Sequence, residues 1–332
     1  MAVLTTGGTY SYQQSAIQII TAALRICQVL GEEETASGAQ LQTGMDALNA
    51  MVKAAQASGI HVWCEEECIL FPQPGQVQYQ IGAGSPDHFT LYPSLLQTTL
   101  AATVAAGGTS LTLTSATNVN AGDQIGVQLD AGTNFWTTVS GTPVGSVVGL
   151  SSPMPSQASV GAIAFDYATP LVRPLRVMGG RRYLYSSKIE TPMIGMSRLD
   201  YGNMPNKYNQ GTITQYFFDP QTGQGAYAAP TALLNLWPSP ADYTFGFRFT
   251  AQRPIQEFST LANIPDFPVE WTAALKWNLA LELAPEYGVP PQMIEATIAP
   301  QATKWFTMAQ GWDREPEPIL FGVAFEPGYR AG

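Results

Sequence analysis

Two kinds of apolar spacing divide the chain, and their order limits the fold that it can adopt. Residues 15–30, SAIQIITAALRICQVL, carry apolar side chains three or four positions apart, which predicts an amphipathic helix. The stretch 38–59 repeats that spacing, and it returns over 266–288 and up to about residue 311. Between these ends, apolar and polar residues alternate in short runs separated by Gly and Pro, as is typical of strands. The order is therefore helical, then β-rich, then helical.

This order predicts an α+β protein. Each terminal helix has an apolar stripe that needs a covering surface, so the N- and C-terminal segments are expected to form one helical bundle. The middle is expected to be a β-rich domain that carries an inserted small β-barrel. The predicted parts are an N-terminal helical hairpin at 1–66, the β-rich domain at 67–98 and 163–255, the barrel at 99–162, C-terminal helices at 256–318 that pack on 1–66, and an extended tail at 319–332.

The insertion is predicted from a change of composition. From about residue 99 to residue 162 the chain consists mainly of Ala, Gly, Thr, Ser and Val with almost no charge. Segments such as SLTLTS and AGDQIGVQL alternate in the manner of strands, and Gly-containing turns separate them. The flanking segments LYPSLLQ and AFDYATPLVRP are expected to belong to a different sheet. Within the insertion, GGTS and AGDQIG lack the Gly-Lys-Ser/Thr ending of a phosphate-binding loop.

Composition excludes several protein classes. Charged residues make up 12% of the 332 residues, about half the usual share. No apolar run approaches the roughly 18 residues that a membrane-spanning helix needs, and the N-terminus MAVLTTGGTY does not have the pattern of a signal peptide. The three cysteines do not suggest a disulfide framework. We expect a protein that is synthesised and folded in a cytoplasm.

The segment GIHVWCEEEC raises the question of a metal or redox site, because His61, Cys64 and Cys68 lie within eight residues of one another. A structural zinc ion needs four ligands, and the chain offers no second Cys or His pair. A catalytic cysteine needs a histidine base in the same pocket. We therefore interpret the segment as the junction between a helix and a strand, with buried thiols, and predict no metal, no cofactor and no catalytic residue.

Charge is distributed unevenly along the chain. The net charge is −10, yet residues 173–208 contain seven of the fifteen basic residues and only two acidic ones. An acidic protein is a poor candidate for simple nucleic-acid binding. The basic stretch is more simply explained by contact with an acidic neighbour, including a second copy of the chain. The predicted subunit-interface residues are Arg173, Arg176, Arg181, Arg182 and Lys188.

Several segments, in their order, resemble one protein family. They are ALNAMVKAAQASGIHVWCEEECILFPQPGQVQYQIG, RPLRVMGGRRY, MIGMSRLDYGNMPNKYNQGTITQYFFDPQTG and IPDFPVEWTAALKWNLALELAPEYG. Together they resemble the head-to-tail adaptor proteins of short-tailed bacteriophages, also called tail accessory or packaged-DNA-stabilising factors. Each motif alone has moderate specificity. Small members of that group lack the inserted barrel, so the resemblance implies no role for it.

The resemblance implies a structural virion protein and no enzyme. It implies a homo-oligomeric ring, usually a dodecamer, at the head–tail junction below the portal protein, with the tail nozzle or tail fibre proteins downstream. Genomic DNA would pass through the ring during packaging and ejection without sequence-specific binding, and no membrane is involved. The C-terminal part of such adaptors reaches the portal, which makes Phe321, Phe325 and Tyr329 the portal-docking candidates.

Two other classes remain open from the residues alone. A tail protein that binds glycans on the host surface would expose aromatic side chains on the inserted barrel. A cell-wall hydrolase would need a cleft with two carboxylates. The resemblance favours the adaptor over both.

Overall fold

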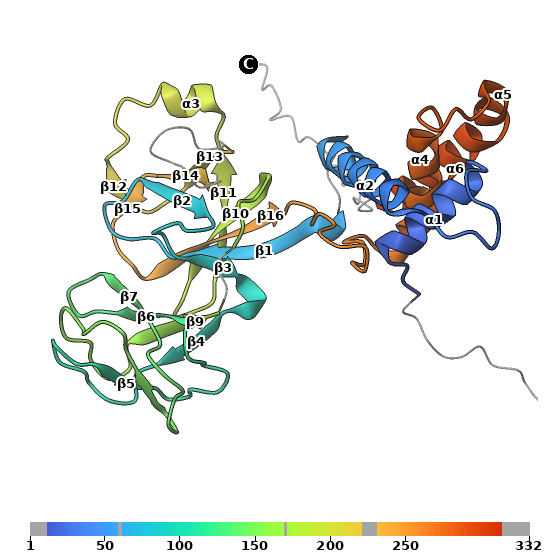
Figure 1. Cartoon of the computed structure of the whole chain (residues 1–332). Helices are drawn as coiled ribbons and strands as arrows, with labels where there is room; N and C mark the ends of the chain where they lie inside the picture. The colour runs from blue at the N-terminus through green and yellow to red at the C-terminus, as the bar shows by residue number, and fades with distance from the viewer. Residues whose placement is uncertain (1–11, 59–61, 169–170, 221–230, 314–332) are drawn as a thin grey trace, which may run out of the picture. The chain divides into compact units, whose positions relative to one another are not determined.

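A computed structural model describes residues 12–58, 62–168, 171–220 and 231–313 (Figure 1). Contacts divide the chain into two compact units. One contains residues 1–63 and 255–332, and the other contains residues 64–254. The protein is of the α+β class and mainly β, as the alternation of apolar residues predicts.

The first unit contains helices from both ends of the chain. In Figure 1 the N-terminal helices, drawn in blue, and the C-terminal helices, drawn in orange and red, lie side by side. Helix α4 contacts α1, α2 and α6. The helices are α1 (Ala16–Ile26), α2 (Gly38–Ser58), the 3-10 turn Val269–Trp271, α4 (Thr272–Leu283), α5 (Pro291–Met293), the π-helical turn Ile294–Ile298 and α6 (Ala299–Trp312).

The spacing predicts Ile17, Ile20, Leu24 and Cys27 on the buried face of α1, and all of them except Ile17 are buried. Its buried residues are Ala16, Ile19, Ile20, Ala23 and Leu24, whereas Ile17 is 39% exposed. Gln18 Oε1 accepts a hydrogen bond from the Ser15 amide at 2.9 Å, which satisfies one free donor at the start of the helix. The spacing predicted the helix correctly, but it could not distinguish Ile17 from Ile19 as the core residue.

The π-helical turn before α6 has its cause in a proline. Pro300 has no amide hydrogen and its ring clashes with the preceding turn of a regular α-helix. The wider turn Ile294–Ile298 precedes it, so that the helical path continues through Pro300 to Trp312. The proline therefore changes the winding of this segment and does not end it.

The second unit contains an eight-stranded, nearly closed sheet in the order β2-β14-β13-β11-β10-β16-β1-β3. All neighbouring strands are antiparallel except β11 and β13. The strands are β1 (Glu65–Leu70), β2 (Gln78–Gly82), β3 (Phe89–Leu91), β10 (Arg176–Leu184), β11 (Glu190–Gly195), β13 (Gln215–Asp219), β14 (Thr231–Trp237) and β16 (Phe245–Gln252). The 3-10 turn η1 (Val62–Cys64) lies at the point in the sequence where the first unit ends and the second begins. Shorter elements of the second unit are η2 (Tyr92–Ser94), α3 (Arg198–Gly202), β12 (Gln210–Gly211) and β15 (Ser239–Pro240).

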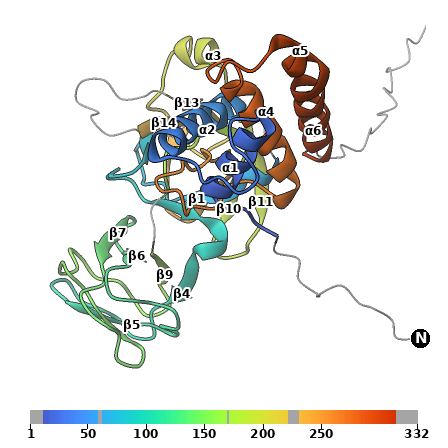
Figure 2. The same ribbon diagram turned by 45° about the vertical axis from the view of Figure 1, so that its right-hand side comes forward.

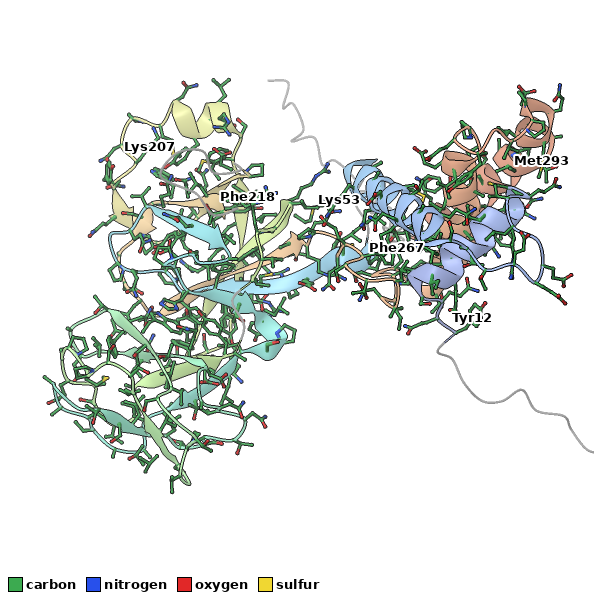
Figure 3. The ribbon with its side chains drawn as sticks, viewed as in Figure 1. Tyr12, Lys53, Lys207, Phe218, Phe267 and Met293 are labelled. Atoms are coloured by element: carbon green, nitrogen blue, oxygen red, sulfur yellow. The ribbon has the colours of Figure 1, made fainter. Side chains whose placement is uncertain are left out.

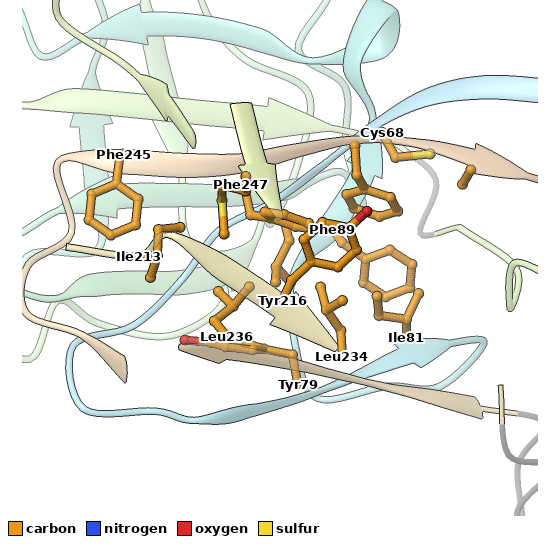
Figure 4. Close-up of a cluster of buried hydrophobic side chains, with 14 residues drawn as sticks. Cys68, Tyr79, Ile81, Phe89, Ile213, Tyr216, Leu234, Leu236, Phe245 and Phe247 are labelled. Carbon is orange, nitrogen blue, oxygen red and sulfur yellow. The ribbon is translucent and has the colours of Figure 1, made fainter. Parts of the chain in front are cut away.

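Strand β16 supplies the centre of the sheet's interior. Phe245, Phe247 and Phe249 alternate along it and are at most 3% exposed, and Figure 4 shows Phe245 and Phe247 among the surrounding core side chains. Gly180 on the neighbouring strand β10 makes room for these rings: a Cβ there would lie 2.5 Å from Phe247. The aromatic alternation and this glycine together allow the sheet to curve around its core.

The strands on either side of the Pro-Gly turn do not pair with each other. The sequence predicts two strands in ECILFPQPGQVQYQIG, and both form, but β1 pairs with β3 and β16 whereas β2 pairs with β14. Strands β2 and β3 are the two ends of the sheet. Asp87, just before β3, accepts hydrogen bonds from the Gln80 amide at 2.6 Å and from Gln76 Nε2 at 2.7 Å. This carboxyl group links the two ends, and burial raises its pKa.

The insertion, for which we keep the name barrel, forms a four-stranded sheet in the order β4-β9-β6-β7 and a two-stranded sheet of β5 and β8, and it is larger than predicted. Strands β4 and β9 pair with each other and β9 pairs with β6, so the flanking segments belong to the barrel's own sheet and the expectation of a different sheet is wrong. The insertion therefore extends to 96–167 instead of 99–162; it lies at the lower left of Figure 2. Its strands are β4 (Leu96–Thr99), β5 (Ser110–Thr112), β6 (Gln124–Gln128), β7 (Asn134–Thr138), β8 (Val147–Gly149) and β9 (Ile163–Tyr167).

Aromatic side chains attach the barrel to the eight-stranded sheet. Phe71, next to β1, has its ring centroid 4.8 Å from those of Trp136 and Phe165 in the barrel. His88 stacks on Trp136 at 4.2 Å, and its Nδ1 lies 2.9 Å from the Tyr167 hydroxyl. Burial lowers the pKa of His88 to about 4, so the ring is neutral at pH 7. The insertion is thus fastened by a packed aromatic contact.

Gly126 tests this contact. A Cβ at Gly126 would lie 2.6 Å from ring atoms of Trp136, whereas a Cβ at Gly141 would have nothing within 4 Å. We expect Gly126→Ala to lower the free energy of unfolding by about 1–3 kcal/mol, because the indole ring must move. Gly141→Ala, the matched control in the same barrel, should change it by less than about 0.5 kcal/mol. Urea unfolding monitored by tryptophan fluorescence measures both, and equal effects would contradict the assignment of Trp136 as the fastening side chain.

Candidate functional site

The predicted interface arginines have different environments. Arg181 lies on β10 directly opposite Arg248 on β16, so two like charges face each other across neighbouring strands. The carboxylates of Glu67 on β1 and Glu190 on β11 offset the repulsion between these two positive charges. All four side chains project from the outer face of four adjacent strands, the face opposite the phenylalanines of β16. We call these four residues the charge cluster.

The charge cluster is fully connected. Glu67 Oε2 accepts from Arg248 Nε at 2.9 Å and from Arg181 at 2.5 Å. Glu190 lies 3.2 Å from Arg181 Nε and accepts from Arg248 at 2.5 Å. Tyr92 covers the cluster from one side, because its ring centroid is 3.8 Å from the Arg248 guanidinium carbon. The four side chains are 20–31% exposed.

The surroundings of Glu67 and Arg248 favour the charged forms of both side chains. Burial by itself would raise the pKa of Glu67, but hydrogen bonds from Thr250, Arg181 and Arg248 lower it below its ordinary value. Burial would lower the pKa of Arg248, and the hydrogen bond to Glu67 together with the charges of Glu190 and Glu67 raises it. Two positive and two negative charges cancel within the cluster. Such a cluster stabilises the register of four strands and leaves no free positive charge for a phosphate or an acidic partner.

The other basic candidates lie apart from the cluster's contacts. Arg173 is half-buried and donates to the Pro220 carbonyl at 3.1 Å. Arg182 is half-buried, and its Nε makes no hydrogen bond within the described part of the chain. Arg176 and Lys188 are exposed, near opposite ends of the β10–β11 hairpin. Exposed apolar side chains accompany them, Ile189 at 60% and Ile194 at 66%.

Sequence reasoning missed Glu67, Glu190 and Arg248 as partners of Arg181. Arg248 lies 67 residues from Arg181 and Glu67 lies 114 residues from it, so no local spacing connects them. A usable signal did exist: Glu67 and Arg248 are charged residues in strands whose other face is apolar. Such positions lie on the outer face of the sheet and pair across strands.

The cysteines of the opening segment are buried. Cys64 and Cys68 are at most 1% exposed, and none of the three cysteines forms a disulfide. Burial raises the pKa of Cys68, and the charges of Glu66 and Glu67 raise it further; burial raises that of Cys27 to about 11. The Cys27 and Cys68 thiols are therefore protonated at pH 7 and poor nucleophiles. His61 lies outside the described residues, and among those described no three His, Cys, Asp or Glu side chains are grouped as metal ligands.

Two buried carboxyl groups lie within the inserted barrel. Asp166 on β9 is 3% exposed and Asp123, just before the paired strand β6, is 6% exposed. Asp123 accepts from the Asn120 amide at 2.7 Å, whereas Asp166 Oδ1 has no hydrogen-bond partner in the part of the chain described. Burial and the charge of Asp123 raise the pKa of Asp166 to about 7. The tail candidates Phe321, Phe325 and Tyr329 lie outside the described residues.

The charge cluster can be tested by removing one carboxylate. Glu67→Gln leaves two adjacent arginines with one partner, and we expect the free energy of unfolding to fall by about 1–3 kcal/mol, below the range for fully buried pairs because these groups are partly exposed. Glu257→Gln is the control, because Glu257 pairs with Lys53 at 2.8 Å where both side chains are over 40% exposed. That change should cost less than about 1 kcal/mol. Chemical denaturation of both variants measures the difference.

Asp166 predicts a pH dependence of stability. Its folded pKa of about 7 exceeds its ordinary value of 3.8, so the folded protein binds the proton more tightly than the unfolded chain. The resulting stabilisation is complete below pH 4 and is lost as the pH rises through 7. Asp166→Asn removes this titration. We therefore expect the Tm of the variant minus the Tm of the wild type to be larger at pH 8 than at pH 5. An identical difference in Tm at the two pH values would show that Asp166 does not titrate in this range.

Comparison with other proteins adds no assignment. The chain matches no protein-family model, and no curated protein sequence matches it. Within the described residues, no helix has the length and apolar character needed to cross a bilayer. The proposed function therefore rests on the surfaces of the two units and on the order of the sequence motifs.

Proposed function

We propose that this chain is a structural head-to-tail adaptor of a short-tailed bacteriophage, a virion protein that forms a ring below the portal. The observation that carries the proposal is the exposed apolar face of α6. Met308 is 56% exposed and Trp312 is 53% exposed, one turn apart on the last helix. Six residues separate Trp312 from the apolar segment 319–332.

Helix α6 has two apolar faces. Ala302 and Ala309 are buried, and Phe306 packs against Trp271 with ring centroids 5.9 Å apart. Met308 and Trp312 leave this inner face and point outward, as their exposure requires. A helix with one apolar face needs one partner, and the second face of α6 supplies a surface for another protein. Tryptophan is enriched at the energetic centres of protein interfaces.

The helical unit is a suitable base for that surface. Helix α4 contacts α1, α2 and α6, which supports a bundle built from both ends of the chain. Figure 3 labels Lys53 and Phe267 in this unit. Lys53 pairs with Glu257, which joins α2 to the segment leading to the C-terminal helices. In the proposed ring this bundle carries α6 and the tail toward the portal, with Phe321, Phe325 and Tyr329 as further anchors.

Contacts between neighbouring copies are proposed for the β10–β11 hairpin. Arg176 and Lys188 are exposed there, together with Ile189 and Ile194. The segment Glu32–Glu34 of the helical unit is exposed and acidic. Basic and apolar groups on one copy facing acidic groups on the next would set the register of a homo-oligomeric ring, which we propose is a dodecamer. Arg181 is excluded from this role, because two carboxylates of its own chain hold it.

The negative net charge supports a role in which the protein does not bind DNA tightly. The protein has a net charge of −10, and the charge cluster neutralises two of its arginines internally. A surface of this kind does not retain a polyanion through counterion release. The proposed ring therefore lets genomic DNA pass during packaging and ejection, and it connects the portal to the tail nozzle or tail fibre proteins.

The two alternatives have less support. The large exposed apolar side chains of the barrel are Val144, Val147 and Val160, while its aromatic rings are wholly or partly buried, which disfavours stacking on sugars. Asp123 and Asp166 are buried within the barrel and cannot reach a polysaccharide. No specific observation on the described residues supports glycan binding or cell-wall hydrolysis.

Electron microscopy of the purified protein mixed with the portal of the same phage tests the proposal. Wild-type protein should cap portal rings. The double variant Met308→Glu/Trp312→Glu should keep its Tm within about 2 °C, because both side chains are exposed, but should lose capping. Val144→Glu, a change at an 80% exposed position of the barrel, is the control and should cap normally. Capping by the double variant would exclude α6 as the docking surface, and absence of capping by the wild type would refute the adaptor proposal.

A further inference from the structure

The helical unit contains a groove that none of the described chain fills. Its walls come from α2, α4 and α6, and its volume is about 250 Å³. The lining is apolar and rich in aromatic rings, and Met51, Trp271, Leu275 and Phe306 are among its residues. A cavity of about 150 Å³ can bind a benzene ring, so this groove has room for one phenyl ring and part of an aliphatic side chain.

One polar group lies among the lining residues. Asn278 uses its Nδ2 to donate to the Ala274 carbonyl at 2.8 Å. No hydrogen bond to its Oδ1 is found within the described residues, so this oxygen is available to accept from a backbone amide. An apolar groove with a single available acceptor is suited to a short peptide segment, because the segment brings apolar side chains and unpaired backbone N–H groups.

The chain has one segment of the required kind outside the described residues. Residues 319–325 read ILFGVAF, without a charge and with two phenylalanines. The segment follows directly after α6, the helix that contributes Phe306 to the groove. Apolar surface on such a segment is costly to leave in water, so the segment favours a site that covers it.

The linker is long enough for the segment to return to the groove. From Phe306 to Asp313 the helical path rises about 10 Å, at 1.5 Å per residue. Residues 314–318, REPEP, contain two prolines and favour an extended conformation that spans about 3.1 Å per residue, or about 15 Å in total. The linker is therefore long enough for residue 319 to reach back to the level of Phe306.

We infer that the groove between α2, α4 and α6 is a binding site for the C-terminal segment 319–325 of the same chain. Phe321 or Phe325 seats its ring in the groove against Trp271 and Phe306, and a backbone amide of the segment donates to Asn278 Oδ1. The segment is thus an intramolecular ligand that covers an apolar surface of the free subunit. The inference concerns the isolated protein and stands or falls separately from the adaptor proposal.

Tethering favours the same chain over a second copy as the source of the segment. A linker of five residues gives an effective concentration in the millimolar range, well above the micromolar concentration of a purified protein. A groove of this size offers too little contact for tight binding of a free peptide. The same contact is sufficient when the peptide is attached beside it.

Cysteine cross-linking tests the inference. The variant Ala54→Cys/Gly322→Cys places one thiol on the groove wall and one between the two phenylalanines, and the control Glu282→Cys/Gly322→Cys places the first on an exposed position of α4. Under mild oxidation we expect the first variant to form a disulfide within one chain at least about tenfold faster than the control. Mass spectrometry of the digested monomer identifies the linked peptides.

Each other outcome overturns the inference. A disulfide between chains, seen as a dimer on a non-reducing gel, assigns the groove to a second copy. Equal rates for the two variants show that the segment has no preference for the groove. Hydrogen exchange gives an independent readout: truncation after Pro318 should make amides of α2 and α4 along the groove exchange at least about tenfold faster. Unchanged exchange in the truncated protein contradicts the proposed contact.

Discussion

Strand β16 is the element on which the β-rich unit depends, because both of its faces are occupied. On one face three phenylalanines fill the interior of the nearly closed sheet. On the other face Arg248 joins Glu67 of the neighbouring strand β1 and Glu190 of β11, which lies beyond β10. If the outer face of a sheet carries only solvent-exposed side chains, that face does not fix the register of its strands. The charge cluster removes this freedom, since a slip of one residue would turn Arg248 toward the phenylalanines and leave two carboxylates opposite nothing.

The sequence allowed the elements to be predicted better than their pairing. Helical spacing located α1, α2 and α4, and alternation located β13, β14 and β16, because both patterns are local. Ile17 was expected to be buried but is exposed, because the apolar stripe of α1 is wide enough to include both Ile17 and Ile19. The contact with α4 decides which of them is covered. The separation of β1 from β2 was not predictable, because a Pro-Gly turn is equally compatible with a hairpin and with a chain that leaves for another strand.

The candidate site shows a similar limit. The basic stretch 173–208 is visible in the sequence, but the environment of each arginine depends on strands that lie far away along the chain. Arg181 and Arg176 look alike in the sequence, yet one is neutralised by its own subunit and the other is exposed. The insertion gave a comparable error. Composition marked 99–162, whereas hydrogen bonding extends it to 96–167, because the closing strands resemble the parent sheet in their residues.

The parallel contact between β11 and β13 has a mechanical consequence. Two residue pairs join these strands, Ile194 with Gln215 and Gly195 with Tyr216, and flanking backbone hydrogen bonds run from Ile194 to Thr214 and from Met196 to Tyr216. Every other boundary of the sheet joins three or more residue pairs. A pull that separates strands breaks hydrogen bonds one after another, and this boundary has the fewest to break. The boundary between β11 and β13 is therefore where the sheet is expected to separate first under load, with the hydrogen bonds of Asp87 still holding β2 to the start of β3.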